Sequence, residues 1–221
     1  IEFVDLVFTS PPYNLNCTTK PGGGFDGLKA GTARAGKWHG GELRDGYATH
    51  GDDMPMEEYE AWQRQVLTQL WRCLSPDGAI FYNHKPRPWL GNIWLPTRLN
   101  PGLPLRQVVI WARAGGINFS PSHYVPTHEW LMVFAKKDWR LKSKAASGLG
   151  DVWRIPQESN PDHPAPFPLS LPAAAIETTA PSLVCDPFAG SATVGRACID
   201  LGRRFVGAER VPKYHAIGMQ R

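Results

Sequence analysis

Two short stretches of this 221-residue sequence carry side chains that could do chemistry, and the first is Ser10-Pro11-Pro12-Tyr13. The apolar run from Phe3 to Phe8 before it predicts a buried strand. The prolines fix φ and lack an N–H, so we expect their carbonyls to point outward as rigid acceptors. With the Ser10 hydroxyl and the flat Tyr13 ring, they suit a planar group bearing an NH2, such as adenine or cytosine. The plainer alternative is a strand that ends in a proline turn.

The second stretch begins at Asp186 and joins a predicted strand (182–185) to a predicted helix (192–201). Gly190 allows close backbone approach, and the helix N-terminus offers N–H groups to an anion. A single glycine leaves little room for a pyrophosphate, so S-adenosylmethionine fits better than NAD; the alternative is a plain strand–helix–strand unit. The expected contacts are Asp186, Pro187, Phe188, Ala189, Gly190, Ser191 and Thr193, with Glu209, at the next strand's end, gripping a ribose.

Basic and aromatic residues alternate without acidic ones in the segment 84–106, as a nucleic-acid-facing loop requires. The glycine-rich segment 16–51 is predicted to be a long loop, and polar residues between 113 and 124 could contact base edges. The alternative for 16–51 is a flexible insertion, and the alternative for 84–106 is an ordinary solvated loop whose tryptophans pack into the core. The predicted DNA contacts are Lys20, Arg34, Lys37, Lys85, Arg87, Arg98, Asn118, His123, Lys136 and Lys137.

The bulk composition indicates one globular domain, with 42% hydrophobic and 20% charged residues and a net charge of +4. The mild positive charge is compatible with a polyanion partner. We expect no membrane span, because no apolar run approaches the length of one. We expect a cytoplasmic location, because the four cysteines have no paired spacing and so indicate neither a zinc knuckle nor a disulfide scaffold.

The pattern of elements predicts an α/β fold, a doubly wound sheet that is mostly parallel with one antiparallel hairpin. We expect a catalytic half (1–144) with loop insertions at 16–51 and 84–106, a linker (145–168) and a cofactor-binding half (169–221). The predicted strands are 3–8, 79–83, 107–111, 130–135, 182–185 and 204–208, and the predicted helices 55–74, 169–179, 192–201 and one from 212.

Taken together, the two motifs resemble those of the amino-group DNA methyltransferases of the permuted (β) class. There the motif (Asp/Asn/Ser)-Pro-Pro-(Tyr/Phe) precedes Asp-Pro-Phe-x-Gly-Ser-Gly-Thr, and here Ala192 replaces the last glycine of the second. The family's usual strand and helix before the first motif are absent from this sequence, so the acidic residue near the cofactor adenine is unassigned. Further matches are Leu74 to Asn83, His128-Glu129, Asp151-Val152-Trp153 and Gly202 to Glu209.

The resemblance implies a circularly permuted, Rossmann-like fold and a methyl transfer from S-adenosylmethionine to the exocyclic amine of a flipped base in double-stranded DNA. Ser10 and the Pro11 carbonyl would accept the amine hydrogens, while Tyr13 stacks on the base. Cytosine C5 methylation is rejected because Cys17 is poorly placed as a nucleophile. The methionine side of the cofactor would be lined by His163, Pro164 and Pro166.

Several functions stay open at this point. Cytosine N4 is the favoured target, and adenine N6 is the first alternative. RNA, a protein glutamine amide and a non-catalytic DNA-binding role are further alternatives. The motifs specify neither a recognition sequence nor a restriction partner, and a homodimer is compatible with them.

Overall fold

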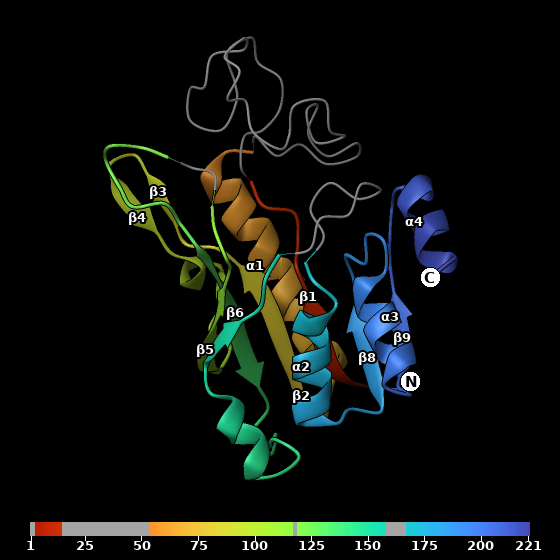
Figure 1. Cartoon of the computed structure of the whole chain (residues 1–221). Helices are drawn as coiled ribbons and strands as arrows, with labels where there is room; N and C mark the ends of the chain where they lie inside the picture. Colours follow the sequence, from red (N-terminus) through yellow and green to blue (C-terminus); the bar gives the residue numbers. More distant parts are fainter. Residues whose placement is uncertain (1–2, 15–53, 117–118, 158–166) are drawn as a thin grey trace.

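The computed structural model describes residues 3–14, 54–116, 119–157 and 167–221 of the chain. Its centre is a seven-stranded sheet with the order β7-β5-β6-β2-β1-β8-β9 (Figure 1). The strands are β1 (Val4–Thr9), β2 (Leu74–His84), β5 (Leu105–Ala112), β6 (His128–Ala135), β7 (Val152–Arg154), β8 (Leu183–Asp186) and β9 (Arg204–Gly207).

The sheet is mostly parallel, as predicted. β1 pairs in parallel with both β2 and β8, and β8 pairs in parallel with β9. β6 is antiparallel to β2 and β5, which confirms the predicted antiparallel pair. β6 is therefore the one strand of this sheet that runs in reverse, and its C-terminal end lies at the edge opposite to the end of β1. The circular permutation that the motif order implies stays a prediction.

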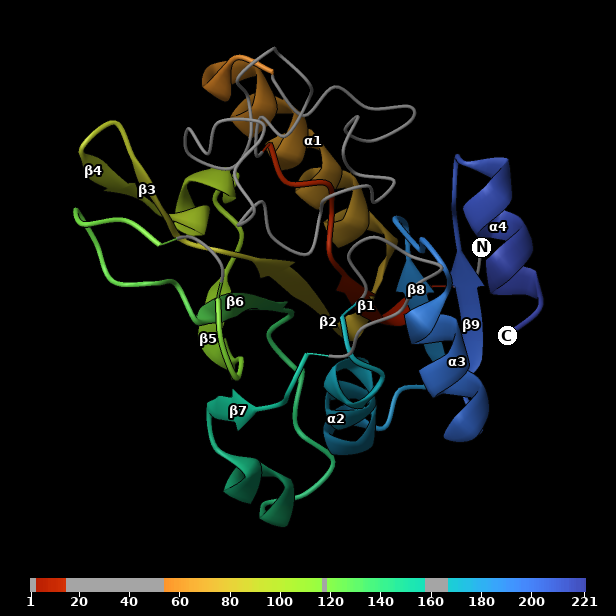
Figure 2. The same ribbon diagram turned by 45° about the horizontal axis from the view of Figure 1, so that its top comes forward.

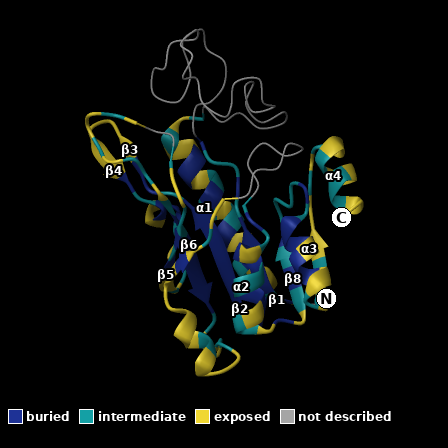
Figure 3. Ribbon diagram, in the orientation of Figure 1, coloured by how far each residue is buried: buried dark blue, intermediate teal, exposed yellow. Residues whose placement is uncertain are grey.

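Helices cover both faces of the sheet. α1 (Met56–Cys73) packs on one face, and α2 (Ser170–Thr179) and α3 (Thr193–Asp200) pack on the other (Figure 2). Side chains of a strand alternate between the faces. Val7 of β1 therefore joins the cluster under α1, whereas Phe8 joins the cluster under α2. The buried strands form the dark-blue centre of Figure 3, and α4 (Pro212–Met219) lies at the β9 side.

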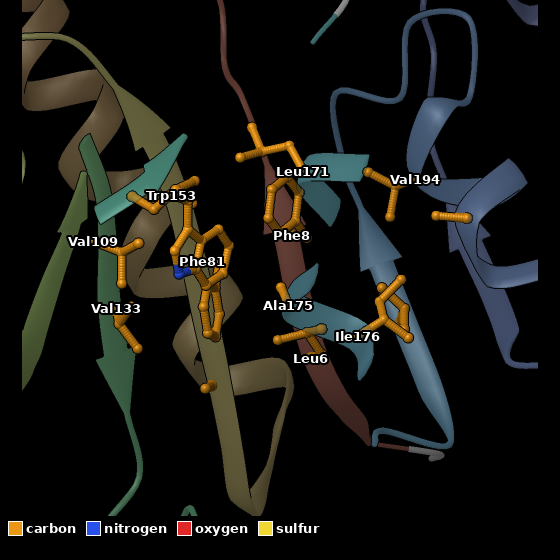
Figure 4. Close-up of a cluster of buried hydrophobic side chains, with 14 of the residues drawn as sticks. Leu6, Phe8, Phe81, Val109, Val133, Trp153, Leu171, Ala175, Ile176 and Val194 are labelled. Atoms are coloured by element: carbon orange, nitrogen blue, oxygen red, sulfur yellow. The ribbon is translucent and has the colours of Figure 1, made fainter. Parts of the chain in front are cut away.

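The core under α2 holds β1 in place. Phe8 lies within 6.3 Å of the Phe81 ring, and Leu171 and Ile176 of α2 cover β1 (Figure 4). These side chains are almost fully buried. Dense packing of this kind leaves β1 little freedom, so the residues that follow Thr9 begin from a fixed point.

Two segments differ from the sequence-based expectation. The segment 84–106, expected to be a loop, contains the hairpin β3 (Arg87–Trp89) and β4 (Asn92–Trp94) and a 3₁₀ turn (Pro96–Leu99). The expected linker 145–168 contains a 3₁₀ turn (Ala145–Leu149) and the edge strand β7. In the described part of each segment a buried tryptophan anchors the chain: Trp94 and Trp153 are at most 5% exposed.

No helix in the described part of the chain combines the length and apolar character that crossing a bilayer requires.

Candidate active site

The two predicted motifs meet at one edge of the sheet. β1 and β8 are parallel neighbours, so their carboxyl ends, and the turns that follow them, lie side by side. The Thr9 hydroxyl donates a 2.7 Å hydrogen bond to Asp186 Oδ1 and joins the two turns directly. Trp62 of α1 also packs edge-on against Phe188. The carboxyl edge of parallel strands is where open α/β sheets bind ligands.

A hydrogen-bonded network surrounds the Ser10–Tyr13 turn, which we call the catalytic corner. Tyr13 Oη donates to Glu129 Oε2 at 2.9 Å and lies 3.1 Å from Ser10 Oγ. Asn83 Nδ2 donates to Tyr13 Oη and to Glu129 Oε2, both at 2.9 Å. Nη1 of the Arg113 guanidinium lies 3.3 Å from Glu129 Oε1. Glu129 and Asn83 are buried, whereas Ser10 and Tyr13 are half-buried.

This network fixes the direction of the Ser10 hydroxyl. The single Tyr13 hydroxyl hydrogen is used for Glu129, because an ionised carboxylate can only accept. In the 3.1 Å contact between the two hydroxyls, Ser10 is therefore the donor and Tyr13 the acceptor. Ser10 Oγ also accepts a 3.4 Å hydrogen bond from Asn83 Nδ2, which leaves one lone pair for a further donor, as the sequence-based role for Ser10 requires.

Residues of α1 hold the proline pair, and the expectation that both proline carbonyls point outward is wrong for Pro12. The Pro12 carbonyl does not point outward, because it accepts hydrogen bonds from Tyr59 Oη at 3.2 Å and Gln63 Nε2 at 3.3 Å. Asn14 exchanges two further bonds with the Met54 backbone, at 2.7 and 2.9 Å. The start of α1 thus holds the corner in place, and the acceptor role of the buried Pro11 stays a prediction.

His84 supports the Tyr13 ring. The two rings stack with centroids 4.3 Å apart, and His84 Nε2 lies 2.6 Å from Tyr59 Oη. The Lys85 amide donates to His84 Nδ1 at 2.9 Å. Burial, with the nearby Arg87 charge, lowers the pKa of His84 from 6.5 to about 3, so the ring is neutral near pH 7. It therefore acts as a flat, uncharged support for Tyr13.

Asp186 is the central carboxyl of the second turn, which we call the cofactor corner. Its Oδ1 accepts hydrogen bonds from Thr9 and from the Phe188 amide. Burial raises the pKa of Asp186 to about 7, and the Glu209 charge adds to the rise, while those two hydrogen bonds oppose it. Its Oδ2 is buried and has no hydrogen-bond partner among the described residues. A ligand that donates a hydrogen bond to this buried oxygen would satisfy it.

Glu209 lies at the end of β9, as expected, and reaches across to the turn after β8. It accepts hydrogen bonds from the Gly190 amide at 2.9 Å and the Val211 amide at 2.7 Å. Gly190 has φ 53°, a left-handed conformation that favours glycine and makes the tight turn possible. The Glu209 carboxylate is therefore held beside the turn by the Gly190 amide.

The remaining residues of this turn lie in two groups. Pro187, Phe188 and Ala189 are half-buried at the edge. Ser191 and Thr193 are buried, and Arg221 donates to both hydroxyls at 3.4 and 3.2 Å. Their expected cofactor contacts stay predictions, since these hydroxyls face Arg221.

Arg87, Lys136 and Lys137 are predicted DNA contacts whose surroundings the structure describes. Arg87 is 8% exposed and its guanidinium lies over the Trp89 and Trp94 rings. Lys136 and Lys137 follow the reversed strand β6 and lie at the edge opposite to Ser10, where Lys136 contacts Trp71. Their contacts to DNA stay predictions.

Arg98 forms a 2.6 Å ion pair with Glu60, which anchors the 3₁₀ turn to α1. Lys85 and His123 lie in segments at the catalytic edge and stay predictions. The other predicted site residues lie outside the described residues: Lys20, Arg34, Lys37, Asn118, His163, Pro164 and Pro166.

Sequence reasoning assigned no role to Asn83, His84 or Glu129. A usable signal was present: Asn83 and His84 end the strand beside β1, where a polar side chain reaches the same edge. Glu129 starts β6, and only the antiparallel pairing with β2 brings it beside Asn83. That pairing could not be inferred from Glu129 itself.

The fold is that of Rossmann-like methyltransferases. PvuII DNA methyltransferase, described as cytosine-N4-specific, superposes with a TM-score of 0.69 at 20% identity, covering 99% of this chain and 79% of that one. M1.HpyAVI in complex with SAM superposes with a TM-score of 0.59 at 17% identity, covering 100% and 89%.

Residues 4–220 match the DNA methylase family N6_N4_Mtase, and the chain therefore belongs to that family. Among curated relatives, the Type II methyltransferase M.BglII of Bacillus subtilis is 26% identical over 261 residues. That alignment covers 98% of this chain but 63% of M.BglII, so the chain spans less than two thirds of that relative.

Proposed function

We propose that this chain is a site-specific DNA methyltransferase that moves a methyl group from S-adenosylmethionine to the exocyclic amine of a flipped base in double-stranded DNA. The observation that carries the proposal is the orientation of Ser10 by Tyr13 and Glu129, at an edge shared with Asp186. Family membership over residues 4–220 supports the same reaction.

The cofactor corner fits S-adenosylmethionine by the chemistry of its groups. This cofactor carries an ammonium group and ribose hydroxyls as donors and a carboxylate as acceptor. Asp186 Oδ2 and the Glu209 carboxylate supply acceptors for those donors, and Glu209 is itself held in place by the Gly190 amide. When bound, the cofactor supplies an electrophilic methyl group on a sulfonium.

The catalytic corner would act by position and electrostatics. The exocyclic amine of a base is a weak nucleophile because its lone pair is delocalised into the ring. Ser10 Oγ and the Pro11 carbonyl would accept the two N–H groups and localise the lone pair. Because His84 covers one face of Tyr13, the base would stack on the other. Extruding the base from the duplex costs a few kcal/mol.

Thiol chemistry at cytosine C5 has no support in the described part of the chain. Burial raises the pKa values of Cys185 and Cys198 to about 12, so neither is a ready nucleophile. Cys73 ends α1 at the edge opposite to Ser10. We therefore retain amine methylation, with cytosine N4 favoured and adenine N6 as the alternative. Two observations favour cytosine: Ser at the first motif position, and the structural similarity to PvuII DNA methyltransferase, which is described as cytosine-N4-specific.

The test is transfer of labelled methyl from S-adenosylmethionine to duplex DNA, followed by digestion and separation of the nucleosides. N4-methylcytosine supports the favoured reaction, and N6-methyladenine supports the alternative. Label in 5-methylcytosine, in RNA alone or in protein alone contradicts the proposal. Binding of DNA without any transfer would leave the non-catalytic alternative.

A further inference from the structure

Glu129 is a buried carboxylate one hydroxyl group away from Ser10. It is 7% exposed and receives hydrogen bonds from Tyr13 and Asn83 on one oxygen. The Arg113 guanidinium contacts its other oxygen. A buried carboxylate is costly unless its charge is compensated, and these three groups compensate it. The methyl-transfer scheme above uses Glu129 only to orient Ser10 through Tyr13.

Methylation of an amine creates a proton that must leave. The base nitrogen forms a bond to the methyl carbon, the carbon–sulfur bond breaks with its electron pair staying on sulfur, and the methylated nitrogen then carries one hydrogen too many. Ser10 Oγ is the expected neighbour of that hydrogen, but a neutral hydroxyl cannot keep it. The Ser10 hydroxyl already donates toward Tyr13, and Tyr13 donates toward Glu129.

We propose that Glu129 is the final acceptor of this proton, which travels through the hydroxyls of Ser10 and Tyr13. Ser10 Oγ takes the proton from the methylated nitrogen and passes its own to Tyr13 Oη. Tyr13 passes its own to Glu129 Oε2, which ends as a neutral carboxylic acid and later releases the proton to solvent. Charge and atoms balance without a further reactant. The inference rests on the proposed function and adds the fate of the proton to it.

The surroundings of Glu129 suit this role. Arg113 keeps its charge at every relevant pH, and it stabilises the carboxylate before turnover. His84, which stacks on Tyr13, stays neutral because burial lowers its pKa to about 3. Glu129 does not touch the base, so by contact it is a positioning residue that acts through Tyr13. Its two roles, orienting Tyr13 and receiving a proton, can be separated by substitution.

Glu129→Gln keeps the size of the side chain and an oxygen that can accept from Tyr13, but it cannot take up a proton. We expect the single-turnover rate of methyl transfer to fall by about 100-fold or more, the range of general acid–base contributions. The affinity for S-adenosylmethionine and the KM for DNA should stay close to wild type, whereas the thermal unfolding midpoint should fall, because Arg113 loses its buried counter-charge. Glu177→Gln, at an exposed position on α2, is the matched control and should leave all four quantities unchanged.

Tyr13→Phe interrupts the same route while keeping the ring. If the three residues form one relay, Glu129→Gln adds little to the loss already caused by Tyr13→Phe, because effects of residues that act as a unit are not additive. Tyr13→Phe also tests the proposal should Glu129→Gln fail to fold.

The outcomes are distinct. No transfer by the wild type defeats the proposed function itself. An active wild type with an unchanged Glu129→Gln rate, or fully additive losses in the double variant, overturns the relay. A Glu129→Gln loss that is matched by lost cofactor affinity overturns it too, since it indicates structural support alone.

Discussion

The catalytic corner and the cofactor corner lie on neighbouring strands but differ in how far their polar groups are satisfied. Around Ser10 and Tyr13, the hydroxyls and the Pro12 carbonyl all have partners within the chain. At Asp186, one buried oxygen lacks a hydrogen-bond partner among the described residues. The first corner is preorganised by its own side chains, and the second is arranged so that a ligand completes it.

The difference extends to charge. Each corner buries one titratable group whose charged form is disfavoured by burial: His84 beside Tyr13 and Asp186 beside Thr9. Burial lowers the pKa of the base and raises the pKa of the acid. Folding stability should therefore respond to pH in opposite directions at the two corners, which gives a way to probe each separately.

The largest expected effect is acid destabilisation through His84. Its pKa is about 3 in the folded chain against 6.5 ordinarily. As pH falls from 6.5 toward 3, the unfolded chain takes up a proton that the folded chain refuses, so stability is lost, by up to about 5 kcal/mol in total. His84→Gln should remove this loss. Urea unfolding between pH 4.5 and 7.5 measures it, and an unchanged acid slope would contradict the burial argument.

Asp186 should show the reverse dependence. Its pKa is about 7 in the folded chain against 3.8 ordinarily. The folded chain holds a proton that the unfolded chain releases, so this contribution to stability is present below pH 4 and is lost, by about 4 kcal/mol, as pH rises to 7. Asp186→Asn should abolish the dependence. In the same urea series, the two variants should then slope in opposite directions; parallel slopes would refute the contrast between the corners.

Tyr13→Ala tests the preorganised corner by removing both the ring and the hydroxyl. Stacking of a base on an aromatic ring contributes about 1–3 kcal/mol, so kcat/KM for DNA should fall roughly 10- to 100-fold from stacking alone. Tyr13→Phe keeps the ring and loses only the hydroxyl, so it is the control for the stacking contribution. Equal losses in the two variants, measured by steady-state transfer of labelled methyl, would assign the whole effect to the hydroxyl.

The smallest expected effect concerns backbone strain in the cofactor corner. Ala192 has φ 59°, a left-handed conformation in which a non-glycine residue costs about 1–3 kcal/mol. Ala192→Gly relieves that strain but adds chain entropy to the unfolded state and removes a methyl that packs near Gly218. We expect a gain of less than about 1 kcal/mol in the free energy of unfolding.

Ala180 provides the matched control for this prediction. It is also left-handed, with φ 52°, but is exposed at the C-terminus of α2. Ala180→Gly should stabilise the chain more than Ala192→Gly, because it removes no packed methyl. The reverse order in urea unfolding would contradict the role given to the Gly218 contact.

Much of the fold could be predicted because the periodicity is local. The run before Ser10 and the apolar face of α1 follow from spacing alone. The pairing of the two motifs at one edge followed from the rule that open α/β sheets bind ligands at strand ends. The burial of Arg87 and the contact of Lys136 with Trp71 could not be predicted, because a charge in the sequence carries no information about burial or packing partners.

The supporting residues of the site could not be predicted for a different reason. Glu129, Asn83 and Tyr13 come from three separate parts of the chain, and their contacts depend on side-chain geometry at the end of an antiparallel strand. His84 shows the same limit, since its neutral state depends on complete burial.

The most direct test of the central claim measures binding and transfer separately in Ser10→Ala. Our account predicts that the dissociation constant for S-adenosylmethionine stays within about twofold of wild type, since Ser10 lies outside the cofactor corner, while the single-turnover rate of methyl transfer to DNA falls roughly 100- to 1,000-fold, as on removal of one oxyanion-hole donor. Lost cofactor affinity with an unchanged transfer rate at saturating cofactor would contradict it.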